Sequence, residues 1–381
     1  MKLRPIGIAV LLIAAVAAPA IWLPMMAALA VWALVALLGV VWFRKPVWRN
    51  ASLFLAATLF GLAGLEFAFW IIDPQSTNSG TVKLDVPDHW LIEDDVVGFK
   101  LKPGIIVDSM SKYGDQVLFH QKYTIDAAGA RATPGSVSNG PTYLFIGDSL
   151  IFSQGLGDDE AMASQFAQSL QPPAHVVNLG VPGYALNNLV RAVETGQYDP
   201  FVVGKVKAVI AWIAHYHMDR VTGDQPWLAE SPRYALESDG RVRYTGDFLD
   251  YRLSHPLDGT YYVARHNFRS VARASHTSMQ RKQAVLYVAL LAQLRDLVKE
   301  RYGAPLVLII DWPQQVEPGA NDNDYVPVYQ SIAALGMPMV SVRQIIGPYQ
   351  NWSKYLIPHD GHPNARLAKL VAQTLRKTLA Q

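Results

Sequence analysis

The chain has 381 residues, of which 51% are hydrophobic and 17% are charged, and its formal net charge is +2. So small a net charge gives no global electrostatic signature of nucleic-acid binding. The sequence contains no cysteine, so no disulfide holds the fold together. A chain of this length is long enough for about two domains.

Three apolar runs fill most of the first 72 residues, at 6–23, 25–43 and 51–72. Each is close to the ~20 residues that a helix needs to cross a bilayer. Basic residues precede the first run and separate the second from the third, whereas the connection between the first two is uncharged. The positive-inside rule therefore predicts a cytoplasmic N-terminus, a cytoplasmic loop at residues 44–49 and an extracytoplasmic later domain. We thus predict a multi-pass protein of the inner membrane with a periplasmic catalytic domain.

Two features of these runs have alternative interpretations. The first run, with its basic start and its Ala18-Pro19-Ala20 ending, also fits a cleaved signal peptide. That reading leaves the predicted orientation unchanged, because the basic loop still determines it. Glu66 is the only acid in the three runs. An ionisable residue in such a segment is often functional, but its position near the outer end favours a contact with the interface or with another helix.

Residues 73–140 are rich in Gly, Asp, Pro and Ser and contain short alternating stretches at 116–120 and 123–125. Asp126-Ala127-Ala128-Gly129 is typical of a turn after the second stretch. We predict a small β-rich segment that links the membrane region to a catalytic domain at 141–381.

From Pro141 onward, short apolar strands alternate with helical patterns. This rhythm predicts a parallel sheet covered on both sides by helices, an α/β fold. A polar and aromatic stretch at 219–282 interrupts it, and this is either an ordinary surface insertion or a lid or acceptor-binding surface. The predicted strands are 142–146, 175–179, 206–213, 306–310 and 339–342, and the predicted helices are 159–170, 185–196, 283–301 and one from about 364.

The first predicted strand runs directly into Gly147-Asp148-Ser149-Leu150. This places the Ser149 hydroxyl at the carboxyl end of a strand, where open α/β sheets bind their ligands. We interpret Ser149 as a nucleophile. The alternative is a serine that only caps the following turn.

A second string, His359-Asp360-Gly361-His362-Pro363-Asn364, supplies a base and an acid. In an extended segment, residues two apart point to the same side, so Asp360 and His362 can meet without help from the fold. A serine hydroxyl is a weak nucleophile until a base takes its proton, and the base works best when a third group fixes its tautomer. Ser149, His362 and Asp360 are therefore the predicted nucleophile, base and orienting acid; the alternative for the last two is a solvated surface loop.

Acyl transfer also needs donors for the developing oxyanion. Asn178-Leu179-Gly180-Val181-Pro182-Gly183-Tyr184 follows the second predicted strand, and a glycine there lets a backbone N–H approach a substrate closely. The alternative is an ordinary strand-to-helix turn that needs glycine for a positive φ.

These strings resemble the sequence blocks of the SGNH hydrolases, also called GDSL-type esterases. Gly147-Asp148-Ser149-Leu150 is similar to the first block, Asn178-Leu179-Gly180 to the second, and Asp360-Gly361-His362-Pro363-Asn364 to the last. The resemblance covers about residues 141–381 and implies a flavodoxin-like three-layer α/β/α sandwich. It also implies the same three catalytic roles and oxyanion donors from the Ser149 and Gly180 amides. We expect no cofactor and no metal. Residues 97–131 look like the lead-in of membrane-tethered members.

One block departs from the family pattern. The family usually places an Asn after the third strand as a side-chain oxyanion donor, whereas here that strand runs into Ala214-His215-Tyr216-His217-Met218-Asp219-Arg220. A neutral imidazole can donate one N–H, so His215 or His217 is the candidate third donor, with His217 preferred. The alternative is a hole built only from backbone amides.

A rival chemistry uses the same histidines as metal ligands. His215 and His217, together with His359, Asp360 and His362, are of the types that bind zinc. Their spacing matches none of the closely spaced metalloprotease signatures, and a metal site leaves the Gly-Asp-Ser string unexplained.

The predicted function is a membrane-anchored serine esterase or O-acyltransferase. It would act outside the cytoplasmic membrane on an acylated surface glycan or lipid, through an acyl-enzyme on Ser149. The expected partners are this substrate and a membrane component of polysaccharide assembly, and nucleic acid is not expected. The alternative from another class is a catalytically inactive glycan-binding or assembly component, because the Asn donor is missing.

Overall fold

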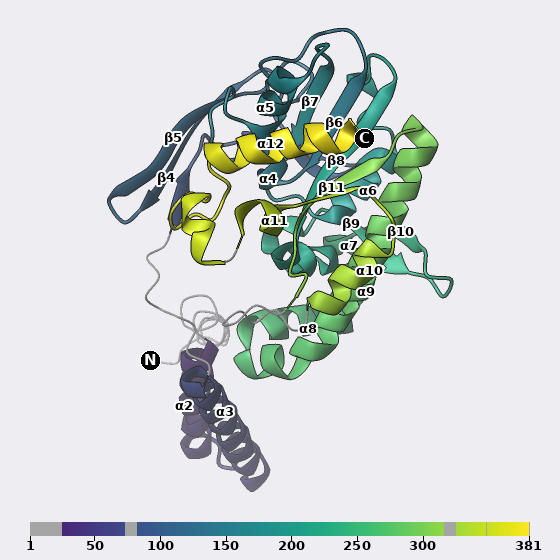
Figure 1. The fold of residues 1–381 in the computed structure, drawn as a ribbon. Helices are drawn as coiled ribbons and strands as arrows, with labels where there is room; N and C mark the ends of the chain where they lie inside the picture. The colour runs from purple at the N-terminus through teal and green to yellow at the C-terminus, as the bar shows by residue number, and fades with distance from the viewer. Residues whose placement is uncertain (1–24, 73–81, 316–324, 348, 381) are drawn as a thin grey trace. The chain divides into compact units, whose positions relative to one another are not determined.

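The computed structural model describes residues 25–72, 82–315, 325–347 and 349–380 (Figure 1). The chain divides into two compact units: residues 1–79 with 256–279, and residues 80–255 with 280–381. The first unit contains the apolar helices, and the second contains the α/β domain.

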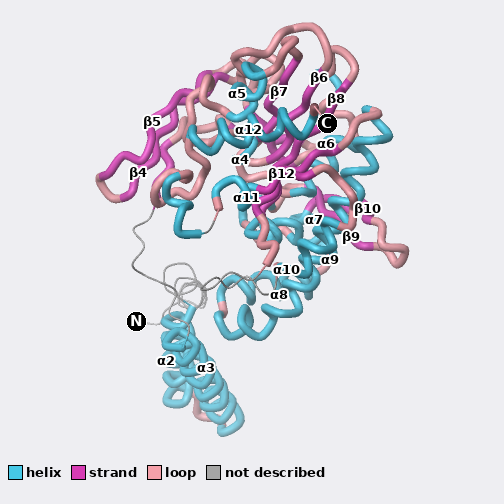
Figure 2. The backbone as a smooth tube through the Cα atoms, in the orientation of Figure 1, coloured by secondary structure: helices cyan, strands magenta, loops and turns pink. Residues whose placement is uncertain are grey.

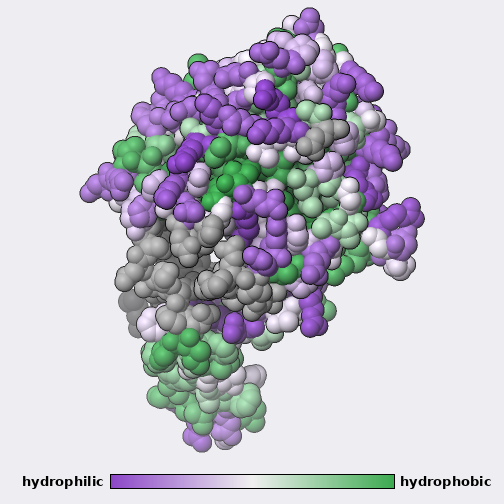
Figure 3. Space-filling view, viewed as in Figure 1, coloured by the Kyte–Doolittle hydropathy of each residue, from purple (hydrophilic) through white to green (hydrophobic). Residues whose placement is uncertain are grey.

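Two helices of the first unit, α2 (Met25–Trp42) and α3 (Pro46–Ile72), are long and apolar enough to cross a membrane, with mean hydropathies of 2.4 and 1.9. The hairpin that they form is largely hydrophobic on its surface and hydrophilic at one end (Figure 3). Helix α3 begins five residues before the predicted run, so Arg49 lies in its first turn. The predicted run at 6–23 lies outside the described residues.

Glu66 of α3 binds the start of another helix of the same unit. Its carboxylate accepts hydrogen bonds from the Arg269 amide at 2.8 Å, the Ser270 amide at 3.1 Å and the Ser270 hydroxyl. These amides open helix α9 (Arg269–Tyr302), which follows α8 (Pro256–Asn267). The first N–H groups of a helix lack intrahelical acceptors and favour a nearby negative charge, so Glu66 caps α9.

The second unit is built on a five-stranded parallel sheet with the order β12-β11-β8-β6-β7. Numbered along the chain, this is the order 2-1-3-4-5 of flavodoxin-like doubly wound folds. The predicted α/β fold with a parallel sheet is thus confirmed. The strands are β6 (Thr142–Gly147), β7 (His175–Gly180), β8 (Val206–Ala214), β11 (Leu306–Asp311) and β12 (Met339–Ser341).

Helices cover both faces of this sheet (Figures 1 and 2). Leu144 and Ile146 pack into one hydrophobic core while Phe145 packs into the other, because successive strand residues point to opposite faces. The first core includes residues of α6 and α9, and the second includes residues of α5 and α12. The remaining helices of this unit are α4 (Ser149–Phe152), α5 (Met162–Ser169), α6 (Leu186–Glu194), α7 (Phe248–Ser254), α10 (Val326–Ala333), α11 (Val342–Ile346) and α12 (Ala365–Leu379).

The starts of helices α5 and α9 differ from the predicted ones, and a hydrogen bond at each start gives the reason. Helix α5 begins at Met162, three residues later than predicted, because the Ser153 hydroxyl accepts the Met162 amide at 3.1 Å and closes the preceding turn. Helix α9 extends 14 residues before the predicted start, back to the amide groups that Glu66 caps.

Antiparallel strands occupy the segment before the sheet, in a three-stranded sheet of order β1-β4-β5 and a β2–β3 hairpin. A further hairpin, β9–β10, lies in the 219–282 insertion. Short 3₁₀ helices complete the second unit: η1 (Asp199–Phe201), η2 (His215–Thr222), η3 (Pro226–Leu228) and η4 (Tyr349–Lys354). The strands are β1 (Val82–Asp85), β2 (Leu91–Asp94), β3 (Gly98–Leu101), β4 (Ile106–Tyr113), β5 (Gln116–Thr124), β9 (Pro232–Leu236) and β10 (Val242–Asp247).

Candidate active site

Ser149 is the first residue of α4, and only Asp148 separates it from the end of β6. The Asp148 side chain caps this short helix by accepting the Leu150 amide at 3.0 Å. β6 lies between β7 and β8, at the point where the strand order reverses. Ligands of open α/β sheets bind at this switch point, so the fold presents the Ser149 hydroxyl where a substrate is expected.

The structure brings the three predicted catalytic side chains together. His362 Nε2 lies 2.8 Å from Ser149 Oγ, although the two residues are 213 positions apart in the chain. His362 Nδ1 is hydrogen-bonded to Asp360 Oδ1, which also accepts the His362 amide at 3.2 Å. Because an ionised carboxylate only accepts, Nδ1 carries the proton and Nε2 is left free to accept one from Ser149. This arrangement can activate a serine hydroxyl.

Asp148 of the Gly-Asp-Ser string is buried and has two further partners. Its Oδ2 lies 2.8 Å from Arg220 Nη1 and 3.1 Å from His217 Nδ1. Burial opposes ionisation of the carboxyl, but His217, Arg220 and the Leu150 amide outweigh it and hold the pKa of Asp148 below its usual range. Sequence reasoning missed Arg220 in this role; the signal was a basic residue shortly after the end of the third strand.

This contact determines which nitrogen of His217 is protonated. Asp148 is ionised, so His217 Nδ1 must donate to it. Burial lowers the pKa of His217 to about 3, so the ring is neutral at pH 7 and its Nε2 has no proton. Donation from Nε2 to an oxyanion therefore requires the charged imidazolium form, and not the neutral ring that the sequence suggested.

The other predicted histidines have different surroundings. His215 Nδ1 faces the Asp311 carbonyl at 3.3 Å, and the His215 ring packs against Tyr325. The His359 ring stacks on Tyr113 at 3.9 Å. Among the described residues, no three side chains of metal-ligand type are grouped as a metal site.

The segment Asn178–Tyr184 packs tightly against α4 at Gly180. A Cβ at Gly180 would lie 2.3 Å from the Phe152 amide nitrogen, so glycine is needed there for close packing; the positive φ of this loop is at Gly183. The Gly180 amide donates to Asn178 Oδ1 at 3.1 Å in this state. Catalytic hydrogen bonds often tighten only when substrate binds. The Ser149 amide, at the first position of α4, has no intrahelical acceptor.

A pocket of about 420 Å³ opens over Ser149. Polar groups line one part of it, including His217, Arg220 and His362, while Trp212 and Trp352 contribute apolar surface. His215 is not among the described residues that line this pocket. A convergent set of polar groups in a partly apolar cavity is the usual form of a small-molecule site.

Arg131 supports the site from the preceding segment and was not identified as a site residue from the sequence. Its fully buried guanidinium donates to the carbonyls of Phe152, Ser153 and Leu156, and its Nε lies 3.1 Å from Asp158 Oδ1. It thereby fixes the chain at the C-terminal end of α4. A buried charge needs such partners, and only the tertiary structure supplies them.

No family model and no curated protein matches the chain. Among solved structures, a member of the lipolytic protein G-D-S-L family from Veillonella parvula is 8% identical, with 62% of this chain and 97% of that chain covered and a TM-score of 0.39. AlinE4, an SGNH-hydrolase family esterase, is 15% identical, with coverages of 64% and 97% and a TM-score of 0.31. The salicylyl-acyltransferase SsfX3 from a tetracycline biosynthetic pathway is 13% identical, with coverages of 64% and 56% and a TM-score of 0.33. Since these TM-scores are below 0.5, the similarities carry no argument about function.

Proposed function

We propose that this protein is a membrane-anchored serine esterase or O-acyltransferase of the SGNH type. The observation that supports the proposal most is the line of hydrogen bonds from Ser149 through His362 to Asp360. The same residues serve a hydrolase and a transferase, which differ only in whether water or an alcohol meets the acyl-enzyme.

In the proposed mechanism, Ser149 Oγ attacks the carbonyl carbon of an ester while its proton passes to His362 Nε2. The tetrahedral intermediate collapses when the bond to the leaving alcohol breaks, and that alcohol takes the proton from His362. Water or an acceptor alcohol, deprotonated by the same imidazole, then attacks the acyl-enzyme and releases Ser149. Asp360 keeps the imidazole in the required tautomer and stabilises its charged form.

The developing oxyanion needs preorganised donors. We assign the Ser149 and Gly180 amides as two of them. His217 is the proposed third, in its charged form, because it lines the pocket and its Nδ1 is committed to Asp148.

The substrate class follows from the proposed topology. Arg44 and Lys45 lie between α2 and α3, which favours a cytoplasmic position for that loop and an extracytoplasmic catalytic domain. An enzyme tethered in this way suits an acylated glycan or lipid at the membrane surface, together with a membrane partner of polysaccharide assembly.

The proposal is tested with a fluorophosphonate probe on the full chain in nanodiscs. We expect labelling of the wild type and of the control Ser331→Ala, whose serine is exposed on α10. Ser149→Ala should not label. Absence of labelling in folded wild-type protein would favour the inactive binding component, and loss of activity on chelation would favour a metal-dependent hydrolase.

Acyl-acceptor competition then separates the two enzyme classes. The wild type is supplied with a soluble aryl acetate and increasing concentrations of an oligosaccharide acceptor. Release of acetate that is unaffected by the acceptor indicates a hydrolase, whereas acetylated oligosaccharide formed at the expense of free acetate indicates a transferase.

A further inference from the structure

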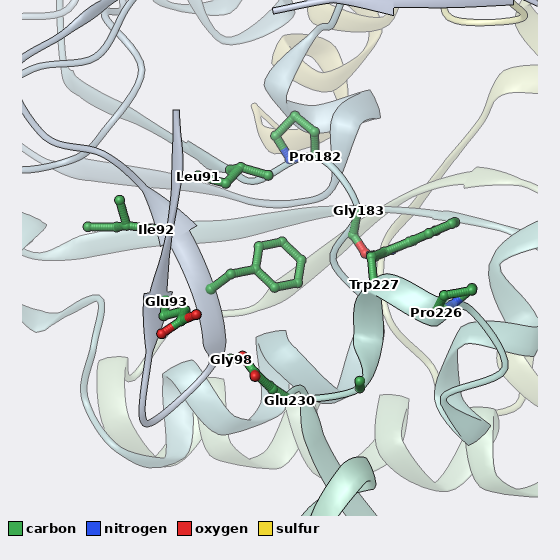
Figure 4. A pocket seen from close by; sticks show the side chains of 11 residues that line it. Leu91, Ile92, Glu93, Gly98, Pro182, Gly183, Pro226, Trp227 and Glu230 are labelled. Atoms are coloured by element: carbon green, nitrogen blue, oxygen red, sulfur yellow. The ribbon is translucent and has the colours of Figure 1, made fainter. Parts of the chain in front are cut away.

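A second pocket, of about 520 Å³, lies beside the loop that follows β7. Its walls come from the β2–β3 hairpin, from Pro182 and Gly183 of the loop, and from η3 with Glu230 (Figure 4). It shares no lining residue with the pocket over Ser149. Arg220, which lines the pocket over Ser149, donates from Nη1 to the carbonyl of Tyr184 at 2.9 Å, and Tyr184 follows Gly183 in this loop.

Trp227 gives this pocket a flat apolar wall that is already held in place. Its side chain is half exposed, yet its Nε1 donates to the Gly183 carbonyl at 3.0 Å. Gly183 has a φ of +92°, and a Cβ there would lie 3.2 Å from the indole nitrogen, so this close contact depends on glycine. An exposed aromatic ring that is immobilised before binding presents a large contact area at little cost in conformational entropy.

Phe99 adds a second ring fixed by the same loop. It packs edge-on against Tyr184 with ring centroids 5.2 Å apart, and the Tyr184 hydroxyl donates to the Phe99 carbonyl at 2.6 Å. Both aromatic side chains of the pocket are therefore positioned by the segment that follows Gly180.

Two carboxylates, those of Glu93 and Glu230, complete the lining and lie on one side of the pocket in Figure 4, with Leu91 and Pro182 on the opposite side. Neither carboxylate has a hydrogen-bonding or ionic partner in the described part of the chain. A ligand with hydroxyl groups can therefore donate to both.

The charge around the pocket restricts the ligand further. A neighbouring hollow of about 330 Å³ shares Glu93 and Glu230, and its lining includes four further acids, of which Asp94 is paired with Lys100 at 2.7 Å: Asp94, Asp95, Asp247 and Asp250. No Lys, Arg or His is among the described residues that line either hollow. A ligand with its own negative charge is repelled here, whereas a neutral one is not.

We propose that the pocket formed by Trp227, Phe99, Glu93 and Glu230 binds a neutral pyranose unit of a glycan. The apolar C–H face of the sugar ring packs on the aromatic wall, and its hydroxyl groups donate to the two carboxylates. The inference rests on the proposed function only in taking this glycan to be the one on which the Ser149 centre acts.

The test measures binding directly, with the full chain in nanodiscs, because maltoside detergents carry sugars of their own. The probes are neutral gluco- and manno-tetrasaccharides and a tetra-uronate, and the readout is calorimetry. We expect a neutral tetrasaccharide to bind, Trp227→Ala to weaken its binding at least tenfold, and Trp227→Phe to weaken it less. The control Leu236→Ala removes an exposed apolar side chain outside the pocket and should bind like the wild type.

A charge test uses Glu93→Gln and Glu230→Gln, which keep an acceptor oxygen and remove the charge. Binding of the neutral sugar should fall by less than about threefold, whereas binding of the tetra-uronate should strengthen. The inference is overturned if no neutral tetrasaccharide binds, if Trp227→Ala binds as well as the wild type, or if the tetra-uronate is preferred by the wild type. Sugar binding and fluorophosphonate labelling are independent measurements. A protein that binds the sugar but is not labelled would refute the proposed enzyme and leave the sugar-binding site in place.

Discussion

The proton on His217 allows a quantitative test of the proposed oxyanion hole. Asp148 accepts a hydrogen bond from His217 Nδ1, so Nε2 can donate to an oxyanion only when the ring is charged. We compare the wild type with two variants. His217→Ala removes the ring, and His217→Asn replaces it with a neutral amide that needs no additional proton to donate.

The expected effect follows from two opposing free energies. With a pKa of about 3, charging His217 at pH 7 costs about 5 kcal/mol, at ~1.36 kcal/mol per pH unit. An oxyanion ~3 Å from Nε2 stabilises the charged imidazolium by roughly 5–6 kcal/mol at an effective dielectric constant of ~20. The two terms nearly cancel at pH 7. The stabilisation requires the charged form, so it increases as the pH falls and is lost as the pH rises.

The assay is kcat for a soluble aryl ester between pH 5 and pH 8, expressed as the ratio of wild type to variant so that titration of the catalytic base cancels. For His217→Ala, the ratio should be near one at pH 7 and rise by up to about tenfold for each pH unit below it. His217→Asn should exceed the wild type at pH 7 by tenfold or more, because one such donor is worth ~10²–10³ in kcat.

Two results would refute this reasoning. A loss of about a hundredfold in His217→Ala that is the same at pH 6 and pH 8 would mean that the neutral ring donates from Nε2. If both variants matched the wild type throughout the pH range, the hole would be formed without any side chain at position 217.

Three further predictions concern the triad, the buried arginine and the topology. Ser149→Ala and His362→Ala should each lower kcat by several orders of magnitude, and the double variant should be little worse than either, because triad members act as a unit; near-normal turnover of Ser149→Ala would exclude the mechanism. Arg131→Ala should lower the free energy of unfolding of the second unit by about 3–5 kcal/mol, measured by denaturant titration, since it leaves buried partners uncompensated. A change below about 1 kcal/mol would contradict the role of Arg131 in fixing the chain at the end of α4. A reporter fused after Gln381 should read as exported and one at Pro46 as cytoplasmic, and an intracellular C-terminus would overturn the proposed localisation and substrate class.

The strand and helix rhythm was predictable from the sequence because it depends on local composition. Strands buried on both faces are continuous apolar runs, and β6, β7, β8 and β11 each begin at the predicted residue. The end of α9 was predictable for the same reason, but its start was not. That start depends on Glu66, which lies 203 residues away from Arg269 in the chain.

The candidate triad was predictable as residue types, because Gly-Asp-Ser and Asp-x-His are short strings whose members lie close by local geometry. The assembly of these residues into one site was not predictable from local geometry, since only the fold brings His362 Nε2 to 2.8 Å from Ser149 Oγ. The resemblance to the SGNH hydrolases predicted this assembly.

Long-range contacts between polar groups were decided by the tertiary structure alone. The proton position on His217 depends on a carboxylate from another strand end, Arg131 finds its acceptors more than 20 residues further along the chain, and Trp227 is held by a carbonyl 44 residues before it. Hydrophobic periodicity predicts which side chains are buried, because burial depends on the position of a residue on its own helix or strand. It does not predict which polar partner a buried group contacts, because the choice of partner depends on how separate helices and strands pack.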